Sequence, residues 1–339
     1  MTTHAKIRIG LAIGILSIGI VFALPCFGQA WVPAKGEGEY ALVYQNLYTR
    51  DHLDQNGDPF DAGKIRLQGL VQAIDFGLTD KLALTTTLPL FSGKYTGAKP
   101  HMFPIDNGNY HGALQDLRFV LRYQMRERPL NLTPFLSVSF PSNHYEHFAH
   151  SAIGGDMWGI GMGLNVGRRL DPWLKNAYFQ ARYTYVVSQL ISVPQYGLNI
   201  RPNRSLYDGE LGYYLSKRIS VRAVAGAQIT HSGLDQNEAN FPVALRTPSD
   251  PRWRQHDRIS RIDYLNVGVG LGIPITKSID AYALYATKAW AQNGHALNDG
   301  ISVGMSWSFR APWARKPTMF AAAPPATWRA KLNEMKLCH

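Results

Sequence analysis

The stretch DLRFVLRYQMR, residues 116–126, alternates two kinds of side chain at successive positions. The apolar and aromatic set consists of Leu117, Phe119, Leu121 and Tyr123. Arg118 and Arg122 belong to the opposite set. Side chains of a β-strand point to opposite faces with a period of two. The stretch therefore predicts a strand with one apolar face and one arginine-bearing face, and the fold must give each face a suitable environment.

The same alternation recurs along most of the chain. Twelve segments show it: 37–48, 64–76, 81–91, 113–125, 131–140, 156–168, 176–188, 206–215, 219–230, 259–273, 279–290 and 300–309. The connections between them alternate in length. The short ones are 77–80, 126–130, 169–175, 216–218 and 274–278, and the long ones are 49–63, 92–112, 141–155, 189–205, 231–258 and 291–299.

This alternation of connection lengths decides the predicted fold class. An even number of amphipathic strands, with short turns at one end and long loops at the other, is typical of an outer-membrane barrel. We therefore expect an all-β, transmembrane, antiparallel up-and-down β-barrel of about 12 strands. Its short turns and both termini would be periplasmic, and its long loops external.

The two faces of the predicted strands can then be assigned. In 300–309, large apolar residues alternate with Gly and Ser, which suits lipid outside and a lumen inside. An arginine facing lipid would cost about 2–4 kcal/mol near the bilayer midplane, so Arg118 and Arg122 should face the lumen. Parity extends the predicted channel lining to eight residues: Lys64, Arg66, Arg118, Arg122, Arg182, Asp208, Glu210 and Arg222. They could pair to stabilise a narrow interior or select solutes, and both roles stay open.

The two ends of the chain differ from this body. Lys6 and Arg8 precede an apolar run over 9–24, and small residues follow, so residues 1–30 are expected to be a signal peptide. A lipoprotein signal at Cys26 is the alternative. The barrel would then occupy 31–309, with Trp31 as the first mature residue. The basic, proline-containing stretch 310–339 is expected to be a disordered periplasmic tail.

Composition excludes several other classes of protein. The chain has 35 Lys and Arg against 24 Asp and Glu, but the basic excess lies mainly at the two ends. Nucleic-acid binding needs a concentrated basic face and a recognisable module, so no nucleic-acid partner is expected. The mature part has no apolar run long enough for a transmembrane helix. Of the two cysteines, Cys26 would leave with the signal peptide, so no intramolecular disulfide is expected.

Three stretches in the body resemble a known family. They are FGLTDKLALTTTLPL at 76–90, GALQDLRFVLRYQM at 112–125 and FLSVSFPSN at 135–143. They resemble the outer-membrane family named after the meta-cleavage pathway of phenol degradation. The resemblance implies a small barrel that passes small aromatic or apolar molecules. Phe309 resembles the terminal aromatic residue that barrel-assembly machinery recognises, so that machinery is an expected partner. The other expected partners are outer-membrane lipid and a small-molecule solute.

Two loops contain candidate metal-binding residues. NHYEHFAH places His144, His147 and His150 at a spacing that could bind zinc, copper or nickel, although no matching Cys/His motif accompanies it. LDQNGDPFD resembles the start of a calcium loop, but Pro59 and Ile65 break that pattern, and an Asn-Gly turn explains it better. We predict no cofactor and assign no metal site. Whether His144, His147 and His150 bind a metal stays open.

An enzyme is the main alternative from another class. His231, Ser232 and Asp235 could form part of a hydrolase site, but adjacent strand residues point in opposite directions and no G-x-S-x-G motif occurs. We therefore predict no catalytic residues. The expected function is an outer-membrane channel or porin for passive uptake of small molecules. A structural or adhesive barrel, or an outer-membrane hydrolase, remains an alternative.

Overall fold

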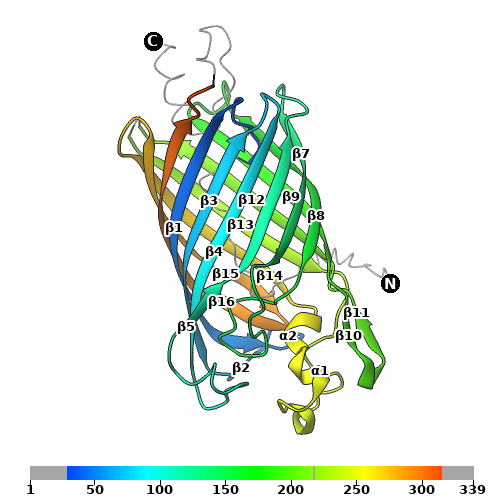
Figure 1. Ribbon diagram of the computed structural model, residues 1–339. Coiled ribbons are helices and arrows are strands. Elements are labelled where there is room, and N and C mark those ends of the chain that lie inside the picture. The colour runs from blue at the N-terminus through cyan, green and yellow to red at the C-terminus, as the bar shows by residue number, and fades with distance from the viewer. Residues whose placement is uncertain (1–28, 217, 315–339) are drawn as a thin grey trace, which may run out of the picture.

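Over residues 29–216 and 218–314, which the computed structural model describes, twelve long antiparallel strands close into a barrel (Figure 1). Each pairs with the next along the chain, and the last pairs with the first, so the sheet has no open edge. The barrel strands are β1 (Glu37–Leu53), β3 (Lys64–Gly77), β4 (Leu82–Thr96), β6 (Asp116–Tyr123), β7 (Asn131–Pro141), β8 (Gly159–Arg169), β9 (Ala177–Ser188), β12 (Arg204–Tyr214), β13 (Ser220–Thr230), β14 (Asp263–Pro274), β15 (Ile279–Gln292) and β16 (Gly294–Arg310). The predicted fold class is confirmed.

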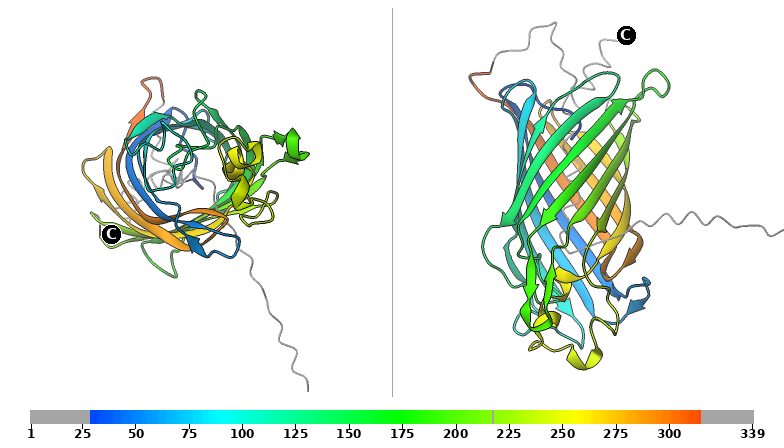
Figure 2. Two further views of the ribbon diagram at one scale, coloured as in Figure 1. Left: turned by 90° about the horizontal axis from the view of Figure 1, so that it is seen from below. Right: turned by 90° about the vertical axis from the view of Figure 1, so that its right-hand side faces the viewer.

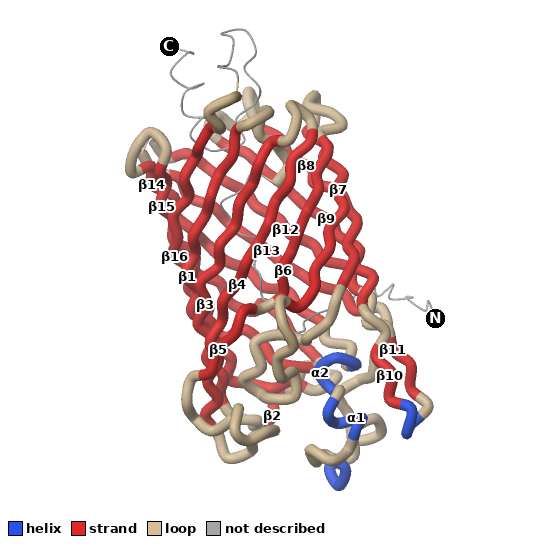
Figure 3. Tube along the Cα trace, viewed as in Figure 1, coloured by secondary structure: helices blue, strands red, loops and turns tan. Residues whose placement is uncertain are grey.

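Shorter elements lie at the end of the barrel that carries the long loops (Figure 3). Two short strands extend the sheet, and two others form a separate hairpin around a 3₁₀ turn. The elements are β2 (Pro59–Phe60), β5 (His111–Leu114), β10 (Ile191–Val193), η1 (Pro194–Tyr196), β11 (Leu198–Ile200), η2 (Val243–Leu245), α1 (Pro251–Arg254) and α2 (His256–Ile259). Among the described residues, no helix is long and apolar enough to cross a membrane.

The connections between barrel strands alternate much as predicted. Short turns gather at one end and long loops at the other (Figure 2). The predicted loop at 291–299 is wrong, because β15 and β16 continue through it and only Asn293 separates them. The strand extends there because β1 runs to Leu53 and offers partners as far as the pairs His52–His295 and Leu53–Gly294.

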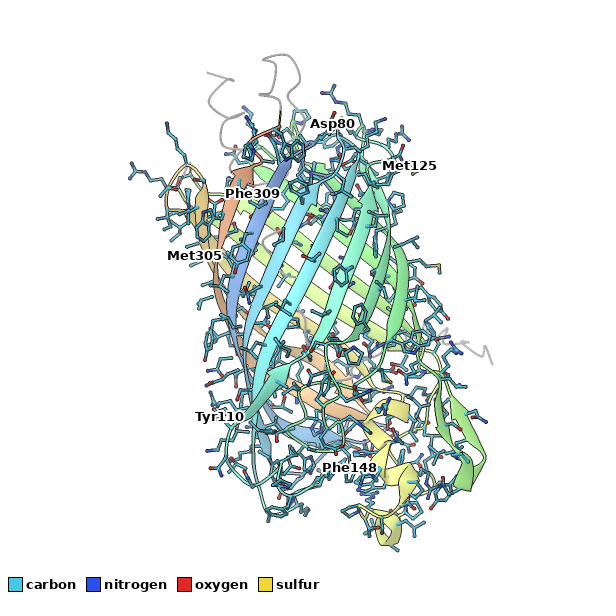
Figure 4. The ribbon with its side chains drawn as sticks, in the orientation of Figure 1. Asp80, Tyr110, Met125, Phe148, Met305 and Phe309 are labelled. Atoms are coloured by element: carbon cyan, nitrogen blue, oxygen red, sulfur yellow. The ribbon has the colours of Figure 1, made fainter. Side chains whose placement is uncertain are left out.

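The outer and inner faces of the wall differ in size and polarity. On β16, Met305 is 45% exposed and Trp307 is also 45% exposed, whereas Ser302 and Ser306 are 3% exposed. Met305 and Phe309 lie on the outside of the wall in Figure 4. Gly and Ser on the inner face leave room for larger side chains from neighbouring strands. The predicted faces of this strand are confirmed.

Alternation in the sequence does not decide which residues of β15 face outward, because Tyr282, Leu284 and Trp290 compete with Ala283 and Tyr285. In the structure Tyr282 and Leu284 are buried, while Tyr285 is 44% exposed on the outer face. Trp290 also reaches the outer face, because a register shift beside Leu265 and Asn266 on β14 changes the parity. A bulge of this kind cannot be read from alternation alone.

Candidate functional site

Most of the predicted lining residues point into the barrel. Six of the eight do so in the described chain: Arg118 and Arg122 on β6, Arg182 on β9, Asp208 and Glu210 on β12, and Arg222 on β13. Arg122 is fully buried and Arg182 is 7% exposed. Leu121 and Tyr183, adjacent to them in sequence, are 42% and 41% exposed on the outer face. The placement agrees with the parity argument, whereas a role in selectivity stays a prediction.

Charges of both signs pair across this interior. One guanidinium nitrogen of Arg122, Nη2, lies 2.5 Å from each carboxylate oxygen of Asp75 on β3. Arg222 Nη1 lies 3.8 Å from Glu210 Oε2, and the Tyr178 hydroxyl donates to Glu210. Buried charges require such partners, because desolvation would otherwise make them too costly. The lumen is therefore lined by paired charges near the turn end.

Lys64 and Arg66 are corrections to the predicted lining. Both are exposed on β3, while Ile65 and Leu67, which alternate with them, are 3% and 6% exposed. Arg66 Nη1 donates to Asn46 Oδ1 at 3.1 Å on the outside of the wall. The inner face is apolar at this end of β3, so the expectation that polar residues face inward is wrong for Lys64 and Arg66. Near a membrane interface, an outward arginine costs only about 0–1 kcal/mol.

Residues 29–36, the N-terminal segment, enter the lumen at the turn end. Ala30 and Trp31 are buried and pack against Tyr178 and Tyr214 on the inner face. Arg122 Nη1 donates to the carbonyl oxygens of Gln29 and Trp31, each at 2.9 Å. The segment therefore fills part of the lumen and is held by one of the predicted lining arginines.

The loop end is covered by a cap, which we define as residues 97–110, 142–158 and 231–262 (Figure 2). Its apolar side chains, among them Phe148, Phe241, Trp253 and Ile259, form one buried cluster. Phe148 lies within this loop region in Figure 4. Beneath the cap, the inner wall is also apolar and includes Val43, Leu67 and Phe91. The lumen thus changes from charged near the turns to apolar near the loops.

Five histidines meet between this wall and the cap. This histidine cluster consists of His52, His101, His150, His256 and His295. Ring centroids lie 3.5 Å apart for His101 and His150 and 4.2 Å apart for His52 and His295. His52, His150, His256 and His295 are each at most 5% exposed. No local spacing in the sequence relates them, so sequence reasoning found only His150.

The predicted trio in NHYEHFAH does not converge. The His144 side chain is 99% exposed, and its Nδ1 lies 3.4 Å from Asp156. His147 contacts Arg258, with 3.4 Å between His147 Nε2 and Arg258 Nη1. His150 alone turns into the histidine cluster. These residues form an irregular loop with bends and no helix, so side chains that one helical turn would have brought together are separated.

Burial favours the uncharged form of two histidines of the cap, His101 and His256, because it lowers the pKa of each. Desolvation lowers the pKa of His256 to about 4, although its bond to the Trp253 carbonyl acts in the opposite direction. Desolvation also lowers the pKa of His101 well below its ordinary value, with His256 and His150 adding to the effect. It raises the pKa of Asp257 to about 7. Neutral imidazole is the form that can accept a hydrogen bond or bind a metal.

The loop residues considered for hydrolysis do not form a catalytic pair. The Ser232 hydroxyl donates to the Arg201 carbonyl, and Asp235 binds Arg261 at 2.7 Å. His231 Nε2 instead lies 2.8 Å from Ser205 Oγ, but Ser205 is only 2% exposed. A nucleophile must be reachable by its substrate, so this pair gives no support to catalysis.

Comparison with solved structures identifies the architecture. The chain matches an outer-membrane channel from Pseudomonas putida F1 with a TM-score of 0.59, at 14% identity, over 83% of this chain and 98% of that one. The chain has the fold of an outer-membrane barrel. The NanC porin matches less closely, with a TM-score of 0.46 and 12% identity over 78% of this chain and 98% of that one.

Sequence comparison adds no family. No family model matches the chain, and no curated protein does. The resemblance to the phenol meta-cleavage family therefore stays a prediction. The predicted signal peptide lies almost wholly outside the described residues, which begin at Gln29, and so does the basic tail beyond residue 314.

Proposed function

We propose that this protein is an outer-membrane channel for passive uptake of small molecules, including aromatic or apolar ones. The observation that carries the proposal is the interior. A closed barrel holds paired charges near the turns and an apolar section under the cap. A barrel that serves only adhesion does not need an interior that changes from charged to apolar along its axis. A conducting path, in contrast, needs a series of sites that each bind the solute weakly.

Both ends of the path are occupied in this structure. The N-terminal segment fills the turn end, and the cap covers the loop end. Passage of a solute along the lumen therefore requires both of them to move. The apolar section beneath the cap favours solutes that shed water readily, which agrees with the small aromatic or apolar molecules that the family resemblance implies.

Conductance with a matched pair of arginine variants tests the proposal. The refolded mature chain is placed in a planar bilayer under a salt gradient, beside Arg118→Ala and Arg66→Ala. Arg118 lies inside the barrel and Arg66 outside, so only Arg118→Ala should shift the reversal potential toward cations. Liposome swelling with phenol-sized solutes measures uptake directly.

The alternatives predict different results. Absence of both conductance and solute uptake from a folded barrel would favour the structural or adhesive role. Equal shifts from Arg118→Ala and Arg66→Ala would mean that the current does not pass through the lumen. Hydrolysis of a lipid ester analogue would revive the enzyme alternative.

A further inference from the structure

The histidine cluster joins the barrel wall to the cap. His52 on β1 and His295 on β16 are direct partners in the ladder that closes the barrel. His150 comes from the cap, and its ring centroid lies 5.7 Å from that of His295 and 6.4 Å from that of His52. Three imidazoles from the first strand, the last strand and a loop therefore converge on one buried point.

Several ring nitrogens of the cluster are buried without a hydrogen-bond partner in the described chain. They are His52 Nδ1 and Nε2, His101 Nδ1, His150 Nδ1, His256 Nε2 and His295 Nε2. Packing alone does not explain these buried nitrogens, because apolar side chains would fill the same space without burying a polar atom that lacks a partner. Buried imidazole nitrogens that converge in this way are typical metal ligands.

The other ring nitrogen is fixed in two of these residues. His150 Nε2 lies 2.9 Å from the Lys99 carbonyl oxygen, and His256 Nδ1 lies 2.7 Å from the Trp253 carbonyl oxygen. A carbonyl can only accept, so each of these nitrogens carries the proton and donates. The lone pair then belongs to the other ring nitrogen, His150 Nδ1 or His256 Nε2. A backbone bond of this kind orients the histidine ligands of metal sites.

The spacing fits a small ion bound by nitrogen. One ligand atom from each of His52, His150 and His295 lies within 4.8 Å of the others. Zn–N bonds of about 2.0–2.1 Å place tetrahedral ligands about 3.4 Å apart, so small side-chain movements close the site. A second set, His52, His256 and Asp257, meets the same distance and shares His52. Its Asp257 Oδ1 lies 3.3 Å from His256 Nε2.

We propose that His52, His150 and His295 bind a divalent transition-metal ion of the Zn²⁺ type. Three neutral imidazoles favour Zn²⁺, Ni²⁺ or Cu²⁺ over Ca²⁺ or Mg²⁺, which prefer oxygen. Asp257 or water takes the fourth position. A pocket lined by His147, Asp257, Arg258 and His295 provides the route of entry. The bound ion ties the cap to both strands that close the barrel, whether or not the barrel transports solutes.

Metal titration of the full mature chain, without an added histidine tag, tests the site. The refolded protein in detergent is stripped with chelator and titrated with Zn²⁺ by calorimetry. We expect one tight site per chain. His150→Gln and His295→Gln should each weaken binding at least about tenfold, since even loss of an outer-shell partner costs about 10- to 100-fold in metal affinity. His144→Gln, exposed and in the same loop as His150, is the matched control and should bind like the wild type.

A spectroscopic readout keeps the test independent of variant folding. Co²⁺ bound to the wild type should show the intense visible bands of a four-coordinate site and should be displaced by Zn²⁺. Zn²⁺ should also slow proteolysis of residues 142–158 in the wild type and not in His295→Gln. Absence of stoichiometric Zn²⁺ binding and of the Co²⁺ bands in the wild type would overturn the proposal, as would equal loss in His144→Gln.

Discussion

At the scale of single residues, Arg122 links the wall, the lumen and the N-terminal segment. It is fully buried, contacts both carboxylate oxygens of Asp75, and donates to the carbonyl of Trp31, which the predicted mature chain keeps. A buried ion pair adds little net stability compared with apolar packing, but removal of one member leaves an uncompensated charge. Arg122 thus joins Asp75 on β3 to the N-terminal segment, two parts of the interior that lie far apart in the sequence.

Substitution of Arg122 should therefore destabilise the barrel. We expect Arg122→Ala to lower the free energy of unfolding by about 3–5 kcal/mol, because Asp75 loses its partner in a buried site. Denaturant unfolding in micelles measures the change. Arg66→Ala, on the exposed face, should stay within about 0.5 kcal/mol of wild type. If the two variants unfold alike, the buried pair does not have this role.

At the scale of elements, alternation explains the barrel strands wherever one face is clearly apolar and the other small or polar. β16 meets that condition, with Val303 at 44% exposure outside and Ser302 at 3% inside. β3 does not, because Ile65, Leu67 and Val71 face the apolar section of the lumen. Strand period alone gives two faces, and the environment decides which face is inside.

A charge on the outer face of β16 should show where lipid contacts this strand. We expect Val303→Arg to destabilise the folded barrel in bilayers by about 2–4 kcal/mol, because the site lies along the middle of the wall. In Phe309→Arg, at the turn end, the outward charge should destabilise the folded barrel by only about 0–1 kcal/mol. Unfolding from liposomes measures both. A larger cost for Phe309→Arg than for Val303→Arg would contradict this position of the membrane.

At the scale of the whole molecule, closure brings the first and last strands together and creates features that neither strand has alone. The ladder between β1 and β16 places His52 opposite His295, and the cap adds His150 and His256 from two other loops. The same closure encloses the N-terminal segment beside β6 and β9. Barrel, segment and cap therefore act as one unit.

Removal of the N-terminal segment should open the turn end. A chain that starts at Glu37 lacks Trp31 and Val32, both buried in the lumen, and should show larger single-channel conductance than the mature chain. Planar-bilayer recording compares the two, and Trp31→Ala should give an intermediate value. Unchanged conductance on removal of residues 31–36 would show that the limiting constriction lies elsewhere, with the cap as the next segment to shorten.

The sequence by itself determined the barrel, its strand number and most of its inner charges. Those features follow from a period of two and from the cost of placing charge in lipid, and both act locally along each strand. Only the tertiary structure decided the faces of Lys64 and Arg66, the long hairpin of β15 and β16, and the histidine cluster. Each depends on contacts between distant segments: an apolar interior behind β3, the reach of β1 beside β16, and loops that fold back over the lumen. Alternation carries no information about such contacts, because they arise only when the sheet closes.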